Sequence, residues 1–255
     1  MEKDSAFRER IIKQARFQLL EYHFPVQICD IQSTGQRIIV GDSQESLHWV
    51  RYRKAENALV VFCDDQTPRY MSCMCILDYN TVAVGDRFGT IAILRLPDRV
   101  SEDVQEDPTG LRSHWDRGHL NGASQKMDMV SVFYIGDQIT SIQKTSMIPG
   151  ANDCIVYTTI GGAIGILVPF MSKDETSFFE NLELHMRSEF PPLCGRDHLT
   201  FRSYYHPCKN VIDGDLCEQF GLMEVMKQKA VAEELDKTAS EISKKLEDIR
   251  TRFAF

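Results

Sequence analysis

The sequence contains no apolar run close to the roughly 20 residues that a membrane-spanning helix needs. None of its 8 cysteines forms a C-x-x-C pair. Several of them lie in apolar, strand-like segments, where a free thiol behaves as a small hydrophobic side chain. These absences predict a chain without a membrane helix or a disulfide framework, and they favour a reducing compartment.

Positive charge is also scarce. The chain has 29 Lys and Arg residues against 37 Asp and Glu residues, which gives a formal net charge of −8. A broad nucleic-acid surface needs clustered lysines and arginines, so this deficit argues against extensive direct binding of RNA or DNA. With 255 residues, of which 43% are hydrophobic, the composition is typical of one large or two modest globular domains.

The sequence does contain a repeated motif. Val40-Gly41-Asp42 and Val84-Gly85-Asp86 each end one strand-like run and begin a tight turn into another, and residues 158–167 give a looser copy. Asp42 and Asp86 are 44 residues apart, within the roughly 40–45 residues of a four-stranded propeller blade. The spacing therefore predicts a β-propeller repeat.

Period-two alternation predicts eleven strands in three blades. They are 26–31, 37–42, 46–53 and 58–63, then 69–77, 80–85, 90–96 and 127–135, then 138–144, 153–160 and 163–169. A polar, acidic insertion occupies residues 97–126. We therefore expect a partial WD40-like β-propeller of about three blades over residues 26–171, with the last blade incomplete. Since propellers close with about 4–8 blades, this predicts part of something larger.

The remaining segments have helical periodicity. Residues 1–25 predict an N-terminal helix over 5–22, and residues 172–255 predict an α-helical C-terminal domain. In that domain a helix is expected over 174–187, another after a capping box at Asp215–Glu218, and another over 222–236. Thr238-Ala239-Ser240-Glu241 is a second capping box and predicts the last helix. The fold class is mainly β with a helical bundle after the partial propeller.

Two motifs are compatible with a functional site, but each is better explained as a turn. Gly161–Gly165 could cradle a phosphate, yet it lies between two predicted strands and so predicts a hairpin turn. Asp42 and Asp86 could form a carboxylate pair, yet each occupies the same turn position, where aspartate is common. We therefore predict no catalytic residues, no cofactor and no small-molecule substrate.

A metal site is the third possibility. Cys194, His198, His206 and Cys208 fall within fifteen residues, and zinc uses such ligands. Their spacing, C-x3-H followed by H-x-C, departs from the standard fingers. We predict no metal site here, and a small metal-dependent enzyme is the least favoured alternative.

Long blocks of the sequence resemble a known family of propeller proteins. The blocks are Gln44–Ser46, Trp49–Tyr52, Glu106–Gly110, Trp115–Gly118, Asn121–Lys126, Arg196–Tyr205, Lys209–Phe220 and Ser243–Phe255. The Ile-Asp-Gly-Asp-Leu core at 212–216 is similar to the whole family, which includes damaged-DNA-binding protein 1 and the cleavage-and-polyadenylation specificity factor A subunit. The other blocks resemble its splicing branch. The resemblance covers roughly residues 26–255, whereas residues 1–25 are not family-like.

The resemblance implies a non-enzymatic, nuclear interaction scaffold in the SF3b complex of the U2 ribonucleoprotein, which acts in pre-mRNA splicing at the branch site. It implies binding to the large helical-repeat subunit and a small subunit of SF3b, contact with RNA only through the complex, and no membrane. The alternative within the family is an adaptor of a cullin ubiquitin ligase or a 3′-end-processing subunit. We predict that the partner-binding residues include Trp115, Asp116, Arg117, Arg196, Asp197, Tyr204 and Tyr205. For Trp115 of the insertion, packing against the propeller of this chain is the open alternative.

Overall fold

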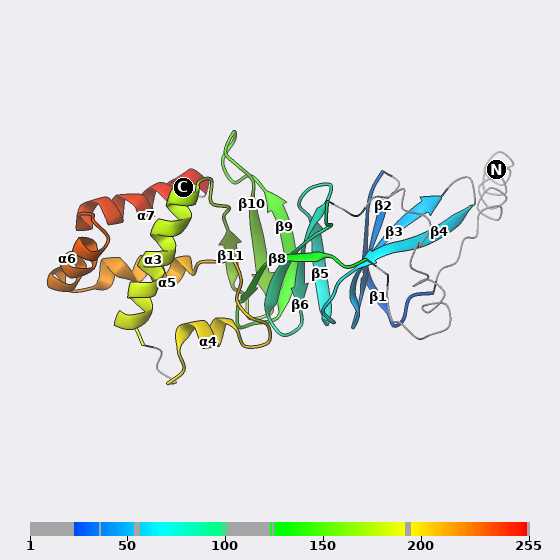
Figure 1. Ribbon diagram of the computed structural model, residues 1–255, viewed down its shortest axis with the longest axis horizontal. Helices are drawn as coiled ribbons and strands as arrows, with labels where there is room; N and C mark the ends of the chain where they lie inside the picture. Colours follow the sequence, from blue (N-terminus) through cyan, green and yellow to red (C-terminus); the bar gives the residue numbers. More distant parts are fainter. Residues whose placement is uncertain are drawn as a thin grey trace, which may run out of the picture. The chain divides into compact units, whose positions relative to one another are not determined.

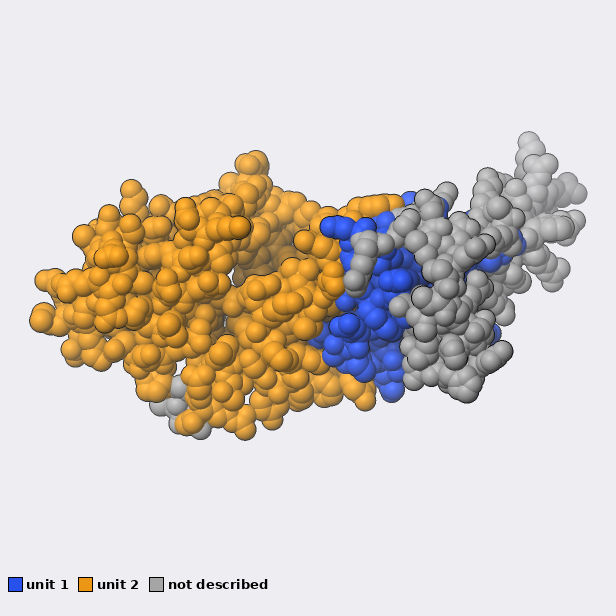
Figure 2. Space-filling model, viewed as in Figure 1, with its two compact units in different colours: residues 1–69, 97–127 blue, residues 70–96, 128–255 orange. Residues whose placement is uncertain are grey.

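The computed structural model describes residues 23–253, except 36, 54–56, 99, 101–122, 124 and 192–194. The chain forms two compact units, which Figure 2 colours separately. Unit 1 comprises Met1–Arg69 with Pro97–Met127, and unit 2 comprises Tyr70–Leu96 with Asp128–Phe255. The predicted helix over 5–22 lies outside the described residues. No helix among those described is long and apolar enough to cross a membrane.

Unit 1 contains one antiparallel sheet, whose strands pair in chain order (Figure 1). The strands are β1 (Ile28–Thr34), β2 (Arg37–Asp42), β3 (Ser46–Arg53) and β4 (Ala58–Asp64). Ile39 pairs with Trp49 across β2 and β3, and both side chains are buried. The indole Nε1 of Trp49 donates to the sulfur of Met127 at 2.8 Å, so the residue that directly follows the 97–126 insertion is joined to this core.

Unit 2 contains two antiparallel sheets. The first consists of β5 (Met71–Ile76), β6 (Thr81–Asp86), β7 (Thr90–Arg95) and β8 (Asp128–Tyr134), and the second of β9 (Ile139–Thr145), β10 (Cys154–Thr159) and β11 (Ile164–Leu167). Ala83 and Ile91 of the first sheet pack with Ile139 and Ile142 of the second. The packing is so close that a Cβ at Gly85 would lie 2.7 Å from the Ile139 side chain. The eleven predicted strands are all found among the described residues, where they form three antiparallel sheets.

The two repeated aspartates are turn residues, as the sequence predicts. A carboxylate oxygen of Asp42 accepts the backbone N–H of Gln44 at 3.0 Å. The equivalent oxygen of Asp86 accepts the backbone N–H groups of Phe88 and Thr90 at 2.9 and 2.8 Å. Each buried carboxylate therefore satisfies the backbone donors of its own turn.

The glycine-rich segment is a hairpin turn between β10 and β11. The Thr159 N–H donates to the Ala163 carbonyl at 3.0 Å, and the Gly162 N–H donates to the Thr159 carbonyl at 3.1 Å. Gly162 has a φ of +87°, which favours glycine. The hairpin prediction is confirmed, and the phosphate cradle is not supported because no helix follows the loop.

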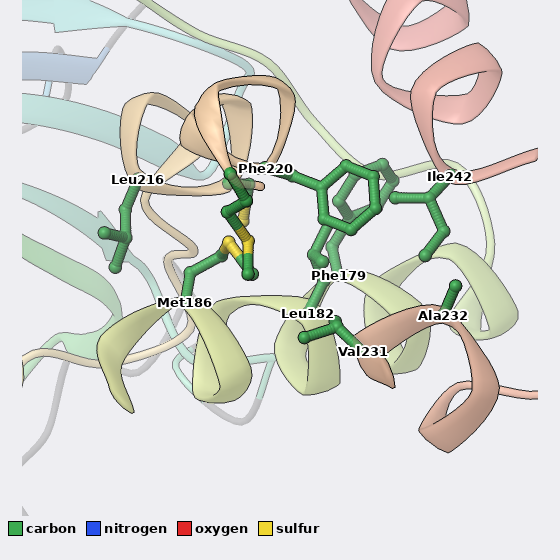
Figure 3. Close-up of a cluster of buried hydrophobic side chains, with 10 residues drawn as sticks. Phe179, Leu182, Met186, Leu216, Phe220, Val231, Ala232 and Ile242 are labelled. Atoms are coloured by element: carbon green, nitrogen blue, oxygen red, sulfur yellow. The ribbon is translucent and has the colours of Figure 1, made fainter. Parts of the chain in front are cut away.

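The described helices of unit 2 follow the last sheet, and five of them contribute side chains to one apolar core. They are α3 (Lys173–Glu189), α4 (His198–Arg202), α5 (Gly214–Glu218), the 3-10 helix η1 (Gln219–Leu222), α6 (Val225–Glu234) and α7 (Ala239–Phe253). Figure 3 shows side chains from α3, α5, η1, α6 and α7 converging on this core. Phe220 and Leu182 are completely buried in it.

One of the two predicted helix caps is confirmed and the other is displaced. The Thr238 N–H donates to Glu241 Oε2 at 2.8 Å, and the Glu241 N–H donates to Thr238 Oγ1 at 3.3 Å, which is a reciprocal capping box. The cap of α5 is Asp213, whose carboxylate accepts the Leu216 N–H at 3.2 Å. The prediction that Asp215 caps this helix is wrong, because Asp213 occupies the cap and Asp215 lies in the first turn.

Acid is expected to destabilise the folded chain through His48 of β3. This side chain is buried, and its Nε2 has no hydrogen-bond partner among the described residues. Burial lowers the pKa of His48 below 6.5, against the opposing charges of Asp42 and Asp65. Between the folded and unfolded pKa values the unfolded chain binds more protons, so stability falls as the pH drops from about 7 through 6.5 and levels off below the folded pKa.

The measurement is the thermal unfolding midpoint between pH 7.5 and pH 5. His48→Gln removes the titrating group, so its midpoint should depend less on pH in this window than that of the unmodified chain. His23→Gln, at an exposed position of the same unit, is the matched control. Equal slopes for the unmodified chain and the His48 variant would contradict the assignment.

Candidate functional site

Six aromatic residues gather at one end of the β5–β8 sheet. Tyr70 precedes β5, Phe88 lies in the turn from β6 to β7, and Tyr134 ends β8. Because neighbouring strands are antiparallel, these three positions meet at the same end of the sheet. The segment that begins in α4 adds its own rings beside them. The full set, called the aromatic cluster below, is Tyr70, Phe88, Tyr134, Phe201, Tyr204 and Tyr205.

The rings of the aromatic cluster contact one another in an unbroken series. Phe88 lies 5.3 Å from Tyr70 and 4.9 Å from Tyr205, measured between ring centroids. Tyr134 lies 5.5 Å from Tyr204 and 5.8 Å from Tyr205. Such separations are those of favourable offset-stacked and edge-to-face aromatic pairs. The cluster is therefore a cohesive surface built from four separate chain segments.

The cluster is open to solvent. Tyr70 and Phe88 are each 43% exposed, Tyr204 is 50% exposed and Tyr205 is 47% exposed. Within the described part of the chain, no hydrogen bond engages the hydroxyl of Tyr70, Tyr134, Tyr204 or Tyr205. Burial, with the neighbouring Tyr205 and Tyr204, raises the pKa of Tyr134 above its usual value. The Tyr134 hydroxyl is therefore protonated at neutral pH and remains a hydrogen-bond donor.

Arg202 fastens the α4 segment to the sheet. One guanidinium nitrogen donates to the Tyr134 and Ile135 carbonyls at 3.0 and 3.3 Å. The same guanidinium lies 4.6 Å from the centre of the Phe133 ring, as in a cation–π contact. Its remaining donors reach the Asp213 carboxylate at 2.6 and 2.8 Å. Arg202 therefore positions the residues that follow it, Tyr204 and Tyr205.

Asp213 is the anion at the centre of this network. Its side chain is 4% exposed, and besides Arg202 it contacts His198 Nε2 at 2.9 Å. Its other oxygen caps α5, and its backbone N–H donates to Glu183 of α3 at 3.2 Å. Three helices and the end of β8 thus depend on one buried, fully bonded carboxylate.

A cavity of about 290 Å³ adjoins the network and is lined by His198, Arg187 and Cys208 among others. Two of its polar side chains have partners, since Arg187 contacts Glu183 at 3.2 Å and His198 contacts Asp213. Burial raises the pKa of the Cys208 thiol, which keeps it protonated and a poor nucleophile or metal ligand. These side chains stabilise the fold.

Of the four possible zinc ligands, the structure describes three. Cys194 lies outside the described residues, and His198 is held by Asp213. Among the residues that are described, no group of three or more His, Cys, Asp and Glu side chains is placed to hold a metal ion.

The structure brings together four of the seven predicted site residues. Tyr204 and Tyr205 form the exposed edge of the aromatic cluster. The Arg196 guanidinium lies 5.4 Å from the centre of the Tyr204 ring, and Asp197 occupies the N-cap of α4 without a side-chain cap bond. Trp115, Asp116 and Arg117 lie outside the described residues. The partner-binding role of all seven stays a prediction.

Sequence reasoning missed Tyr70, Phe88, Tyr134 and Phe201, which complete the cluster. One signal was available for Phe88, because a large aromatic side chain in an exposed turn of a repeated motif has no packing reason to be there. Tyr70 and Tyr134 look like ordinary strand-end aromatics until the sheet register is known.

Comparison with known proteins identifies relatives with a common role. Splicing factor 3B subunit 3 of Danio rerio is 60% identical over 233 residues, 91% of this chain and 19% of that protein. Probable splicing factor 3B subunit 3 of Dictyostelium discoideum is 51% identical over 230 residues, 90% of this chain and 18% of that protein. Spliceosome-associated protein 130 A of Arabidopsis thaliana is 47% identical over 245 residues, 96% of this chain and 20% of that protein.

The chain spans about a fifth of the length of these curated relatives. The family model of the CPSF A subunit region matches residues 16–222, which include all eleven strands and the Asp213 network. The predicted resemblance is thereby confirmed, and the chain belongs to the CPSF A subunit region family.

Proposed function

We propose that the chain acts in pre-mRNA splicing as a non-catalytic scaffold of the SF3b complex of the U2 ribonucleoprotein, in branch-site recognition. The observation that carries this proposal is the 60% identity, over 91% of the chain, to a protein named splicing factor 3B subunit 3. The proposed partners are the large helical-repeat subunit and the small subunit of SF3b, in the nucleus. RNA is contacted only through the complex, which agrees with the net charge of −8.

In this proposal residues 26–171, with the insertion 97–126, are part of a WD40-like β-propeller, and residues 172–255 form a helical C-terminal domain. Two four-stranded sheets and one three-stranded sheet support it, because the strands of each sheet pair in chain order. So does the face-to-face packing of the β5–β8 sheet on the β9–β11 sheet. Each further blade would cover another sheet face in the same way.

A scaffold role also agrees with the chemistry of the candidate site. The aromatic cluster offers ring faces and hydroxyl donors, which bind and orient a partner. Arg202, which bonds to the Tyr134 carbonyl, is paired with Asp213, and His198 contacts the same carboxylate.

The test is a stringent purification of the tagged chain from nuclear extract, followed by mass spectrometry. We expect the large and small SF3b subunits to be enriched over a purification with an unrelated propeller protein. Absence of both subunits would contradict the proposal. A cullin or 3′-end-processing subunits in their place would favour the alternative role within the family.

A further inference from the structure

The last strand of the third sheet, β11, has an outer edge with which no further strand pairs in the described part of the chain. We propose that this edge pairs with β11 of a second copy of the chain, so that two three-stranded sheets join into one continuous sheet. This inference goes beyond the proposed function, because it concerns contact between identical chains. Three features of β11 support it, namely its position, its composition and its symmetry.

The last strands of the other two sheets are each met by a further segment of the chain. At the end of β4, the Asp64 N–H donates to the Gln125 carbonyl at 3.2 Å, and the Met127 N–H donates to the Asp64 carbonyl at 2.8 Å. In β8, Val132 and Lys209 exchange two backbone hydrogen bonds of 3.0 Å. Among the described residues, β11 is the last strand that has only its sheet neighbour, β10, as a backbone partner.

Alternation along the β10–β11 hairpin determines which backbone groups of β11 point outward. The hairpin begins where the Thr159 N–H donates to the Ala163 carbonyl at 3.0 Å. Along an antiparallel pair every second residue bonds to the neighbouring strand, so Gly165, two residues after Ala163, also bonds to β10. The N–H and C=O groups of Ile164 and Ile166 therefore point away from β10, where another strand can bond to them.

The composition of β11 lacks the usual protection of an edge strand. Natural edge strands commonly carry charged side chains or proline, which block the addition of another strand. β11 reads Ile-Gly-Ile-Leu, and no charged residue occurs from Cys154 to Ser172. Ile164 is 75% exposed, although isoleucine is among the residues that are most often buried. β11 therefore has no side chain of its own that repels another strand, and it has an apolar one to cover.

The symmetry of β11 favours a second copy over an unrelated strand. Residues 164–166 read Ile-Gly-Ile in both directions. Antiparallel pairing about a two-fold axis at Gly165 therefore places Ile164 opposite Ile166 of the second copy, twice, and each pair exchanges both of its N–H···O bonds. The isoleucine side chains of both copies then meet on one face of the joined sheet, as favourable cross-strand pairs. A second copy supplies this matched pattern without any further requirement on sequence.

The other face of β11 is already covered at the two-fold axis. The Tyr157 ring of β10 lies over Gly165, because a Cβ built at Gly165 would collide with this ring. Tyr157 and Gly165 are directly paired across the two strands. Each copy therefore brings its own tyrosine to this face, and the two glycines at the axis need no side chain there.

The test is sedimentation-velocity ultracentrifugation of the full 255-residue chain. Because β11 has four residues and small interfaces are weak, a concentration series over about 2–200 μM is needed. We expect the average mass to rise from that of one chain toward that of two. Ile164→Lys should weaken dimerisation by about tenfold or more, since each dimer receives the charge twice. Ile160→Lys, at a 65% exposed position before β11, should dimerise as the unmodified chain does.

A second variant tests the backbone bonds of β11. Ile166→Pro removes an outward N–H donor, and proline is tolerated in an edge strand where the N–H faces solvent. We expect this variant to keep the circular dichroism spectrum of the unmodified chain and to remain monomeric at about 200 μM. If the proline variant unfolds, Ile164→Lys decides the role of the edge.

Three results would overturn the inference. One is an unmodified chain that stays monomeric throughout the series, and another is a dimer that Ile164→Lys does not weaken. The third is growth beyond two chains, since an isologous pair closes on itself. A monomeric chain whose co-purification with SF3b subunits is lost in Ile164→Lys would assign the edge to a partner instead of a second copy. Absence of SF3b subunits with a dimer that behaves as expected would contradict the proposed function alone.

Discussion

Replacing Arg202 with alanine is expected to lower the free energy of unfolding of unit 2 by about 3–5 kcal/mol, the cost of breaking a buried ion pair by removing one partner. The Asp213 side chain, 4% exposed, would lose contacts at 2.6 and 2.8 Å and keep its contacts with His198 and the Leu216 N–H. The Tyr134 and Ile135 carbonyls would lose their donor as well. Urea unfolding followed by circular dichroism measures the change.

Two further variants separate the causes. Arg202→Lys keeps the charge but lacks the planar fork that bonds Asp213 and the carbonyls together, so an intermediate loss is expected. Arg196→Ala, at an exposed arginine of the same segment, should change stability by no more than about 0.5 kcal/mol. A loss at Arg202 as small as that at Arg196 would show that the network contributes little.

Phe220→Ala is the second substitution with a large expected effect. The Phe220 side chain is 0% exposed and lies in the core that Figure 3 shows, with Phe179, Leu182 and Ile242. Removing a buried phenylalanine ring leaves a cavity and costs about 3–5 kcal/mol. The same urea titration should show an earlier midpoint with little change in slope.

Leu222→Ala is the matched control for Phe220. Leu222 lies two residues further on and is 81% exposed, so its truncation should change stability by no more than about 0.5 kcal/mol. If both variants unfold at the midpoint of the unmodified chain, the helices of unit 2 do not unfold cooperatively around this core.

The strands were predictable because their signals are local. In β2 and β3 the alternation and the Asp42 turn determine both ends, and the predicted ranges 37–42 and 46–53 coincide with the observed strands. The third sheet was predicted to have three strands, since the pattern becomes helical after residue 170, and it has three among the described residues. The capping box of α7 was predictable for the same reason, because Thr238 and Glu241 bond only within their own turn.

The aromatic cluster was not predictable, because it exists only after folding. Tyr70, Phe88 and Tyr134 are far apart in sequence, and their proximity depends on which strands pair. The five-residue helix α4 was also missed, since it is too short for a periodic signal. Whether Asp213 or Asp215 caps α5 likewise depends on tertiary contacts. Asp213 is fixed by Glu183 and Arg202, which no local pattern reveals.

The order of the strands in the β5–β8 sheet has a consequence for synthesis on the ribosome. β7 ends at Arg95, and its partner β8 begins at Asp128. At roughly 5–20 residues per second, the intervening residues take about 2–6 s to be translated. During that interval the nascent chain carries a three-stranded meander whose β7 edge has no partner strand from its own sheet. Open strand edges recruit other strands, so nascent chains on neighbouring ribosomes of one message are exposed to mispairing at β7 until β8 arrives.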